Sequence, residues 1–163
     1  MNEVQFLADM MQHSHQFTQR HMQKLEAVDM HKRFAAGDKE LNSAYWLFAH
    51  MTVSQNWLIL RGTNGPFQKF SWAKLFNIGT TPPPIEECPP FDQIKAKLEE
   101  IQTLSLAHVA SLDEASLGLP HNAMMQLPGG NNVRDIIKHH VRHESMHNGQ
   151  LSWLCKLHGL KTI

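Results

Sequence analysis

The sequence predicts an all-α protein: a four-helix bundle forming a single domain over residues 1–163, with a long crossover between the second and third helices. Apolar residues recur at helical spacing in four segments, and residues with helix-capping or helix-breaking chemistry separate those segments. No segment alternates apolar and polar residues with the period of two that is typical of strands. A chain of 163 residues is long enough to bury one core without disulfides.

Start and stop signals mark three of the four predicted helices, the first, second and fourth. Asparagine or serine can accept hydrogen bonds from the first turn of these three, and glycine or proline follows their ends. The predicted bounds are Asn2 to a point before Gly37, Asn42 or Ser43 to about Arg61, Pro90 (with Asp92 near the cap) to about Asp113, and Asn131 or Asn132 to Gly159.

The connection between the second and third helices is unusually long, at about thirty residues. It contains a proline cluster between residues 82 and 90, and a short helix is expected at Ser71–Phe76. A tight turn between antiparallel neighbours needs far fewer residues, whereas a segment that returns along the bundle needs this length. We therefore favour an up-down-down-up order over a simple up-and-down order.

Charge and cysteine content argue against several classes of function. Lys plus Arg and Asp plus Glu both total 15, so the net charge gives no reason to expect binding to nucleic acid or to an anionic membrane. No apolar run approaches the roughly 20 residues of a membrane-spanning helix, and no signal peptide is recognised, so we expect a cytoplasmic protein. Cys88 and Cys155 lack CxxC spacing, which disfavours a thiolate zinc site or a disulfide framework.

Several of the 12 histidines stand where core residues are expected. His50 lies within the apolar face of the second helix, and His143 and His147 interrupt the apolar face of the fourth. Burying an imidazole without a partner costs on the order of 1–3 kcal/mol, and one metal ion would satisfy all three rings. His143 and His147 are four residues apart and face the same side of a helix. We therefore predict a divalent-metal site of His50, His143 and His147 with positions left open for water or substrate.

Neighbouring residues are weaker candidates for catalytic roles. Gln150, one turn beyond His147, can orient a ligand ring or a bound water, and His140 or Glu144 can shuttle a proton. His139 extends the row of imidazoles but lies about 12 Å along the axis from His147, too far to share one ion with it. The candidates for lining an apolar pocket at the ion are Trp46, Met51, Trp57 and Met146, although residues at such spacing usually belong to a core.

Residues 143–147 also match HExxH, the zinc-peptidase signature in which Glu144 would be the general base. The longer HExxHxxGxxH pattern fails, because Gln150 and Trp153 stand at its glycine and histidine positions. No Asp or Glu follows His147 to serve as a third ligand, and no strand is expected that would align a peptide substrate. An HExxH-type zinc peptidase is therefore a minor alternative.

Two stretches of the sequence resemble the DinB/YfiT-like superfamily of metal-dependent enzymes. Residues 42–51 (NSAYWLFAHM) are similar to the family's second-helix segment, in which an Asn, a Trp and a His preceded by a small residue recur. Residues 143–151 (HESMHNGQL) are close to its terminal H-x-x-x-H-x-G-Q-apolar helix. Asn148 stands where an arginine is common in the family, a departure that bears on how an anionic or thiol substrate is held.

The resemblance implies an up-down-down-up bundle that holds a divalent ion by His50, His143 and His147 and that forms a homodimer through helix faces. It further implies a metal-dependent thiol S-transferase or hydrolase, which activates a thiol or water for attack on a small electrophilic substrate. Zinc or nickel is the expected ion, with iron and manganese as further options, and a low-molecular-weight thiol is a candidate cofactor. The alternative is a non-catalytic metal-binding or stress-response protein, with no cavity at its ion.

Overall fold

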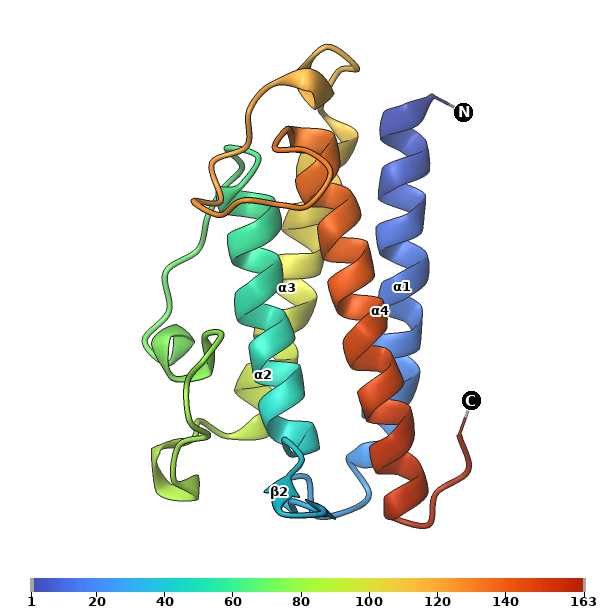
Figure 1. The fold of residues 1–163 in the computed structure, drawn as a ribbon, viewed down its shortest axis with the longest axis vertical. Coiled ribbons are helices and arrows are strands. Elements are labelled where there is room, and N and C mark those ends of the chain that lie inside the picture. Colours follow the sequence, from blue (N-terminus) through green and yellow to red (C-terminus); the bar gives the residue numbers. More distant parts are fainter. Residues whose placement is uncertain (1, 163) are drawn as a thin grey trace.

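The computed structural model describes residues 2–162, in which four long helices form the predicted bundle (Figure 1). In this view α1 and α4 run downward, and α2 and α3 run upward. The second and third helices are thus parallel to each other and antiparallel to the first and fourth, which confirms the up-down-down-up order. The helices are α1 (Glu3–Leu25), α2 (Ala44–Gln55), α3 (Phe91–Ala110) and α4 (Val133–Leu157). None of the helices in the described part of the chain is long and apolar enough to cross a membrane.

Side-chain caps fix the starts of three helices. Asn2, Ser43 and Asn132 each accept a hydrogen bond from the backbone N–H three residues later. Both asparagines belong to reciprocal capping boxes, which satisfy two otherwise unpaired donors at each helix start. α3 begins after Pro90 without a side-chain cap, and α1 already ends at Leu25.

α4 packs against two neighbours and therefore presents two different inward faces. α1 packs on α4 and α3, and α2 packs on α3 and α4. One apolar cluster surrounds Tyr45, Phe48 and Leu98, and a second surrounds Leu7, Ile59 and Ile101 further along the bundle. The polar residues of α4 between these clusters therefore face either α1 or α2.

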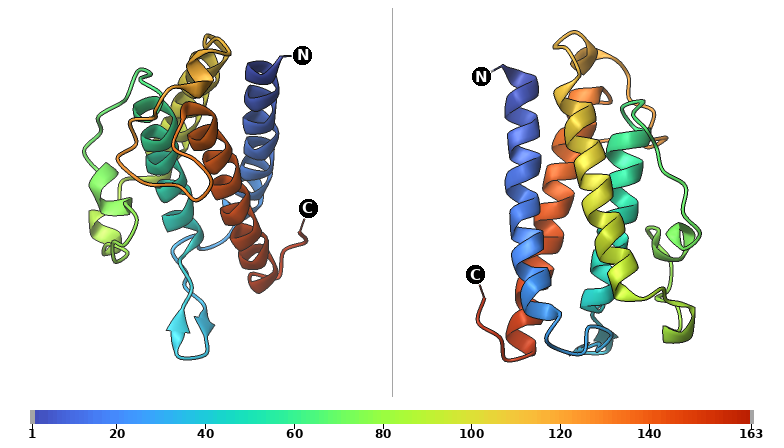
Figure 2. Two further views of the ribbon diagram at one scale, coloured as in Figure 1. Left: turned by 45° about the horizontal axis from the view of Figure 1, so that its top comes forward. Right: turned by 180° about the vertical axis from the view of Figure 1, so that it is seen from behind.

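The crossover of residues 62–90 returns along the outside of the bundle to the start of α3 (Figure 2). It contains two single-turn 3₁₀ helices, η2 (Ala73–Phe76) and η3 (Ile85–Glu87), so the short helix expected at Ser71–Phe76 is present in a shorter form. Phe76 is fully buried in the first apolar cluster, which fixes the crossover against α2. A further single turn, η4 (Ser116–Gly118), lies in the connection between α3 and α4.

Two features of the fold differ from the sequence expectations. α2 continues as a π-helical segment, η1 (Asn56–Arg61), which widens its last turns. A small antiparallel hairpin of β1 (Ala35–Ala36) and β2 (Lys39–Glu40) lies between α1 and α2, so the expectation of no strands was wrong there. Gly37 opens its two-residue turn with a φ of +66°, as a type II′ turn requires. Exposed strands of two residues are too short to show a period of two.

Candidate metal centre

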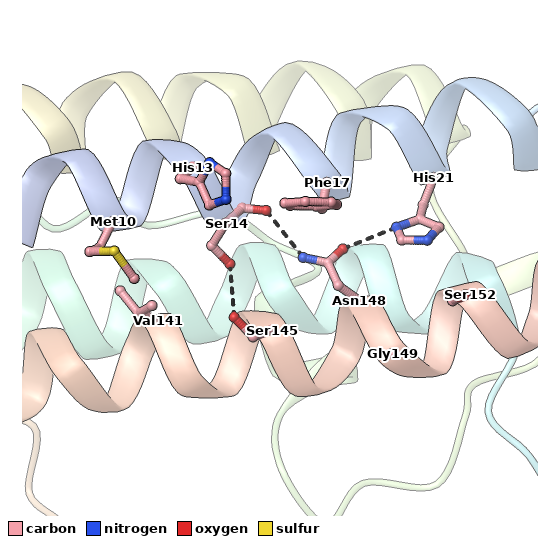
Figure 3. Close-up of a pocket in the computed structure, with 10 residues that line it drawn as sticks. All are labelled: Met10, His13, Ser14, Phe17, His21, Val141, Ser145, Asn148, Gly149 and Ser152. Atoms are coloured by element: carbon pink, nitrogen blue, oxygen red, sulfur yellow. Dashed lines mark hydrogen bonds between the residues drawn. The ribbon is translucent and has the colours of Figure 1, made fainter. Parts of the chain in front are cut away.

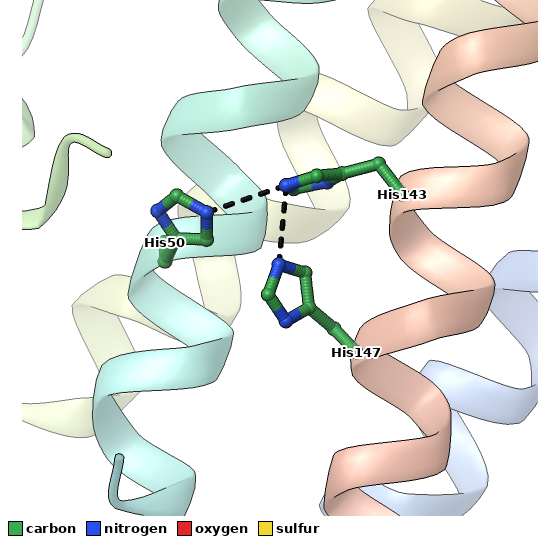
Figure 4. A group of neighbouring side chains, drawn as sticks. All are labelled: His50, His143 and His147. Atoms are coloured by element: carbon green, nitrogen blue, oxygen red, sulfur yellow. Dashed lines mark hydrogen bonds between the residues drawn. The ribbon is translucent and has the colours of Figure 1, made fainter. Parts of the chain in front are cut away.

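Three imidazole rings meet between α2 and α4 (Figure 4). His50 comes from α2, and His143 and His147 come from successive turns of α4. The Nε2 atom of His143 lies 3.3 Å from Nε2 of His50 and 3.1 Å from Nε2 of His147. Two nitrogen ligands of one tetrahedral ion are roughly 3.3 Å apart. In residues 2–162 these side chains form a group that could hold a metal ion, with candidate ligand atoms within 4.8 Å of one another.

The His50 ring is held by two contacts that leave its Nε2 directed at the cluster. Its Nδ1–H donates a hydrogen bond of 2.8 Å to the backbone carbonyl of Phe76. The indole of Trp46 stacks on the ring, with centroids 4.6 Å apart and an angle of 11° between the planes. Because Nδ1 carries the proton, the lone pair of this imidazole is on Nε2, where a metal ligand needs it.

The His147 ring is oriented in the same way by a side chain of its own helix. Its Nδ1–H donates a hydrogen bond of 2.6 Å to Oε1 of Gln150. The contact between Gln150 and a ligand ring that the sequence suggested is therefore present. Two of the three imidazoles thus have their Nδ1 atoms engaged and their Nε2 atoms directed inward, as outer partners of metal-bound histidines arrange them.

Burial keeps all three imidazoles uncharged at neutral pH. It lowers the pKa of His50 and of His147 below the ordinary value. For His143, burial together with the neighbouring imidazoles lowers the pKa to about 2. Neutral imidazole is the form that binds a cation, so these rings need not release protons before binding one.

A cavity of about 430 Å³ opens onto His50 and His143. This volume lies in the usual range for a small-molecule site. Its apolar walls come from α2 and η1, from the crossover and from the loop before α4: Val53, Trp57, Leu58, Ile78, Met124 and Met125. Ser54, Asn77, Ala123 and His139 complete the lining.

Only one of the four residues proposed from the sequence to line a pocket does so. Trp57 lines the cavity, whereas Trp46 stacks on His50, Met51 is buried in the core and Met146 is exposed elsewhere on α4. Met124 and Met125 were missed because they lie in a loop, where helical periodicity gives no signal.

Glu144 faces α1 and makes its contacts there. Its Oε1 accepts a hydrogen bond of 2.8 Å from Oγ1 of Thr18 and lies 3.2 Å from Nδ1 of His15. Burial alone would raise the pKa of Glu144, but the hydrogen bonds from His15 and Thr18, with the nearby His140, hold that pKa below its ordinary value. A zinc peptidase needs this carboxylate beside the ion, so the geometry does not support the peptidase alternative.

His140 belongs to the same buried layer. Its Nε2 lies 3.8 Å from Oε2 of Glu144, and burial lowers its pKa. Successive residues of a helix are turned by roughly 100°, which carries the residue after His143 onto the face that meets α1. The proposed proton shuttle at the ion, by His140 or Glu144, therefore has no support from the contacts that these two side chains make.

Asn148 also lies in the layer between α1 and α4 (Figure 3). Its Nδ2 donates a hydrogen bond of 3.2 Å to the carbonyl of Ser14, and its Oδ1 lies 3.3 Å from Nδ1 of His21. A shallow groove of about 470 Å³ follows this seam, and no residue of the histidine cluster lines it. Asn148 therefore belongs to the α1–α4 contact and does not line the cavity at the cluster.

The α1 side of this polar layer was missed in the sequence. His15, Thr18 and His21 are buried at spacings of three residues, on the same face as the apolar residues of α1. That spacing was a usable signal, since polar residues on a buried helix face require partners on the neighbouring helix.

The fold and the cluster together define a helical-bundle protein with a candidate three-histidine metal site. The family model of the DinB superfamily matches residues 10–151, which include His50, His143 and His147. The chain therefore belongs to the DinB superfamily. A comparison with curated proteins found no match.

Proposed function

We propose that this protein is a metal-dependent enzyme in which His50, His143 and His147 hold a divalent ion at the end of a substrate cavity. The convergence of the three Nε2 atoms is the observation that carries the proposal. A bound ion would supply Lewis acidity, which activates water or a thiol as a nucleophile near neutral pH. Zinc or nickel is the expected ion, with iron or manganese as further options, because imidazole suits all of them.

The reaction class is transfer of a thiol sulfur, or hydrolysis, at a small electrophilic substrate. The sulfur or water oxygen forms a bond to the electrophilic atom while the bond from that atom to the leaving group breaks. The leaving group takes the electron pair of the broken bond, and the proton of the thiol or water passes to solvent or to the leaving group. A low-molecular-weight thiol would be the second substrate in the transfer reaction. The chain's own residues contribute by orientation: the carbonyl of Phe76 and the side chain of Gln150 each hold one imidazole with its lone pair inward.

The cavity supports an enzyme over the alternative of a non-catalytic metal-binding or stress-response protein. A protein that only stores or senses an ion gains nothing from a small-molecule cavity at the ligands. Here the cavity is lined by two of the three cluster histidines, so a substrate in it would lie next to a bound ion. The homodimer expected from the family resemblance stays a prediction, which sedimentation equilibrium of the purified protein tests.

The first experiment is elemental analysis of purified protein. We expect about one divalent ion per chain in the wild type and a large loss in His50→Ala. His139→Ala is the matched control, because His139 lines the cavity without belonging to the cluster, and it should keep its metal. Equal metal content in the wild type and in His50→Ala would remove His50 from the site.

A second experiment separates enzyme from binder. Low-molecular-weight thiols and water are offered to the metal-loaded protein together with a generic electrophile, and product formation is compared with that of the chelated protein. Metal-dependent turnover is expected. Its absence with every thiol and with water would favour the non-catalytic alternative.

A further inference from the structure

The cavity beside the cluster has an unusual distribution of polarity. Five of its twelve lining residues are polar: His50, Ser54, Asn77, His139 and His143. Oγ of Ser54 lies 3.3 Å from Nε2 of His50, and the ring centroid of His139 lies 6.3 Å from that of His143, whereas the other seven lining residues are apolar. No lysine, arginine, aspartate or glutamate lines it in the part of the chain that the structure describes. A ligand inside therefore meets polar groups mainly at the histidine end, and no formal charge on a side chain.

The wide π-helical end of α2 builds one apolar wall. Trp57 and Leu58 of η1 both line the cavity. The Nε1–H of Trp57 donates a hydrogen bond of 2.8 Å to the carbonyl of Ala123. This bond occupies the polar atom of the indole and also holds the loop before α4 against the wall. The indole is thus available to a ligand as an apolar surface.

Two methionines of the loop that Trp57 holds form a further part of the rim. Met124 is 79% exposed and Met125 is 37% exposed, and both line the cavity. Met124 has a φ of +54°, in the left-handed region that non-glycine residues rarely adopt. Methionine is flexible and polarisable, and it adapts to irregular apolar ligands. Neighbouring exposed methionines at a cavity rim are therefore suited to covering an apolar molecule.

The cation next to this wall is engaged outside the cavity. The guanidinium carbon of Arg61 lies 4.9 Å from the ring centroid of Trp57, and its Nη2 lies 3.6 Å from Sδ of Met124. Arg61 thus contacts two wall residues and is not part of the lining. A carboxylate held against these apolar walls, away from the histidine cluster, would thus lose its hydration without gaining a direct ion pair, which is costly.

We infer that the cavity selects a small uncharged molecule with an apolar body and a single metal-binding head, such as a neutral aryl or alkyl thiol. The head lies at the histidine cluster, and the body lies against Trp57, Met124 and Met125. This inference rests on the proposed function for the binding of the head. The apolar walls carry the selection of the body, and they disfavour a body that carries a charged group.

The test compares, on metal-loaded protein, two thiols that differ by one ring carboxylate. Benzyl mercaptan and 4-(mercaptomethyl)benzoate are titrated by calorimetry, and the neutral thiol should bind at least about tenfold more tightly. Met125→Lys places a cation in the wall and should reduce this preference at least about tenfold. Met10→Lys is the matched control: Met10 is 38% exposed in the α1–α4 groove, and the preference should stay unchanged.

A second wall variant, Met124→Lys, guards against loss of folding, because its side chain is largely exposed. It should change the preference in the same direction as Met125→Lys. Equal or tighter binding of the carboxylate thiol to the wild type would overturn the inference. So would an equal effect of Met10→Lys and Met125→Lys.

The metal content of the same samples separates this inference from the proposed function. If the wild type holds no metal, the proposed function fails, and toluene, which has no head group, is titrated instead. Toluene binding that Met125→Lys weakens and Met10→Lys does not would still support an apolar cavity, and no binding would overturn it. If the metal is present and the two thiols bind equally, only the present inference fails.

Discussion

Nδ1 of His50 donates a hydrogen bond of 2.8 Å to the backbone carbonyl of Phe76, a residue of the crossover that lies 26 positions further along the chain. The buried phenyl ring of Phe76 fixes the position of that carbonyl. The crossover therefore orients a candidate ligand as well as connecting two helices.

Phe76→Leu should weaken metal binding through this link. The matched control is Phe48→Leu, because Phe48 is equally buried in the same apolar cluster. Both variants should lose about 1–2 kcal/mol of unfolding free energy, from smaller packing. Only Phe76→Leu should also lose affinity in competition with a metallochromic chelator. Equal affinities in the two variants would show that the Phe76 carbonyl does not position His50.

Gln150→Leu removes the acceptor for Nδ1 of His147. Loss of such an outer partner typically lowers metal affinity about 10- to 100-fold, and we expect this range in chelator competition. Gln150→Glu keeps an acceptor oxygen and should bind metal at least as well as the wild type. Gln93→Leu changes an exposed glutamine on α3 and serves as the control. An unchanged affinity in Gln150→Leu would contradict the orienting role.

The metal-free protein should lose stability as the pH falls below 6.5, the ordinary pKa of histidine. Burial lowers the pKa of His143 to about 2 in the folded chain, so the unfolded chain binds a proton that the folded chain does not. The resulting loss is up to about 1.4 kcal/mol per pH unit for this group.

Urea unfolding of chelated wild type and His143→Gln, from pH 7.5 to pH 5, isolates this contribution. The wild type should lose more unfolding free energy toward low pH than the variant does. His15 acts in the opposite direction, since its pKa is raised in the folded chain despite its burial, through the hydrogen bond with Glu144. The difference between the two proteins removes this shared effect. Parallel pH profiles would contradict the assignment.

Glu144→Gln should lower stability and leave metal content unchanged. The substitution removes the buried charge that pairs with His15 and accepts a hydrogen bond from Thr18. Weakening such a buried contact costs about 1–3 kcal/mol. Thermal unfolding and elemental analysis on the same samples check both parts. Loss of metal-dependent turnover at unchanged stability would instead restore Glu144 as a catalytic base.

Substitution by alanine should change the unfolding free energy in opposite directions at two glycines. A Cβ at Gly62, at the end of η1, would lie 2.1 Å from the backbone oxygen of Leu58, so Gly62→Ala should destabilise the fold and disturb the cavity wall. A Cβ at Gly149 on α4 meets no atom within 4 Å. Gly149→Ala should therefore raise the unfolding free energy by about 0.5–1 kcal/mol. Chemical denaturation of both variants checks the pair, and a stabilised Gly62→Ala would contradict the packing.

Much of the fold could be predicted from the sequence, because helix caps and loop lengths are local features. Asn2, Ser43 and Asn132 cap the helices near which they were expected, and the length of the crossover indicated the helix order. The π-helical segment Asn56–Arg61 could not be predicted from the sequence, because it depends on backbone hydrogen bonding that leaves no distinctive spacing of side chains.

The candidate ligands could also be predicted from local spacing, because His143 and His147 lie one helical turn apart on an inward face and need a partner there. The role of Glu144 could not be read from the HExxH match, because a short motif does not say which neighbour each helix face meets. That depends on how α4 is rotated between α1 and α2. The cavity rim at Met124 and Met125 depends on a loop path that only the folded chain defines.

His50 and His143 touch across 93 positions of sequence, and the free cysteines Cys88 and Cys155 form no disulfide between the helices that carry these two histidines. A cation shared by these rings would bind the folded chain and not the unfolded chain, so its binding free energy would add to the stability of the fold. The concentration of free metal would then set the stability of the contact between α2 and α4. A shortage of the ion would lower the stability of the whole bundle as well as the proposed activity.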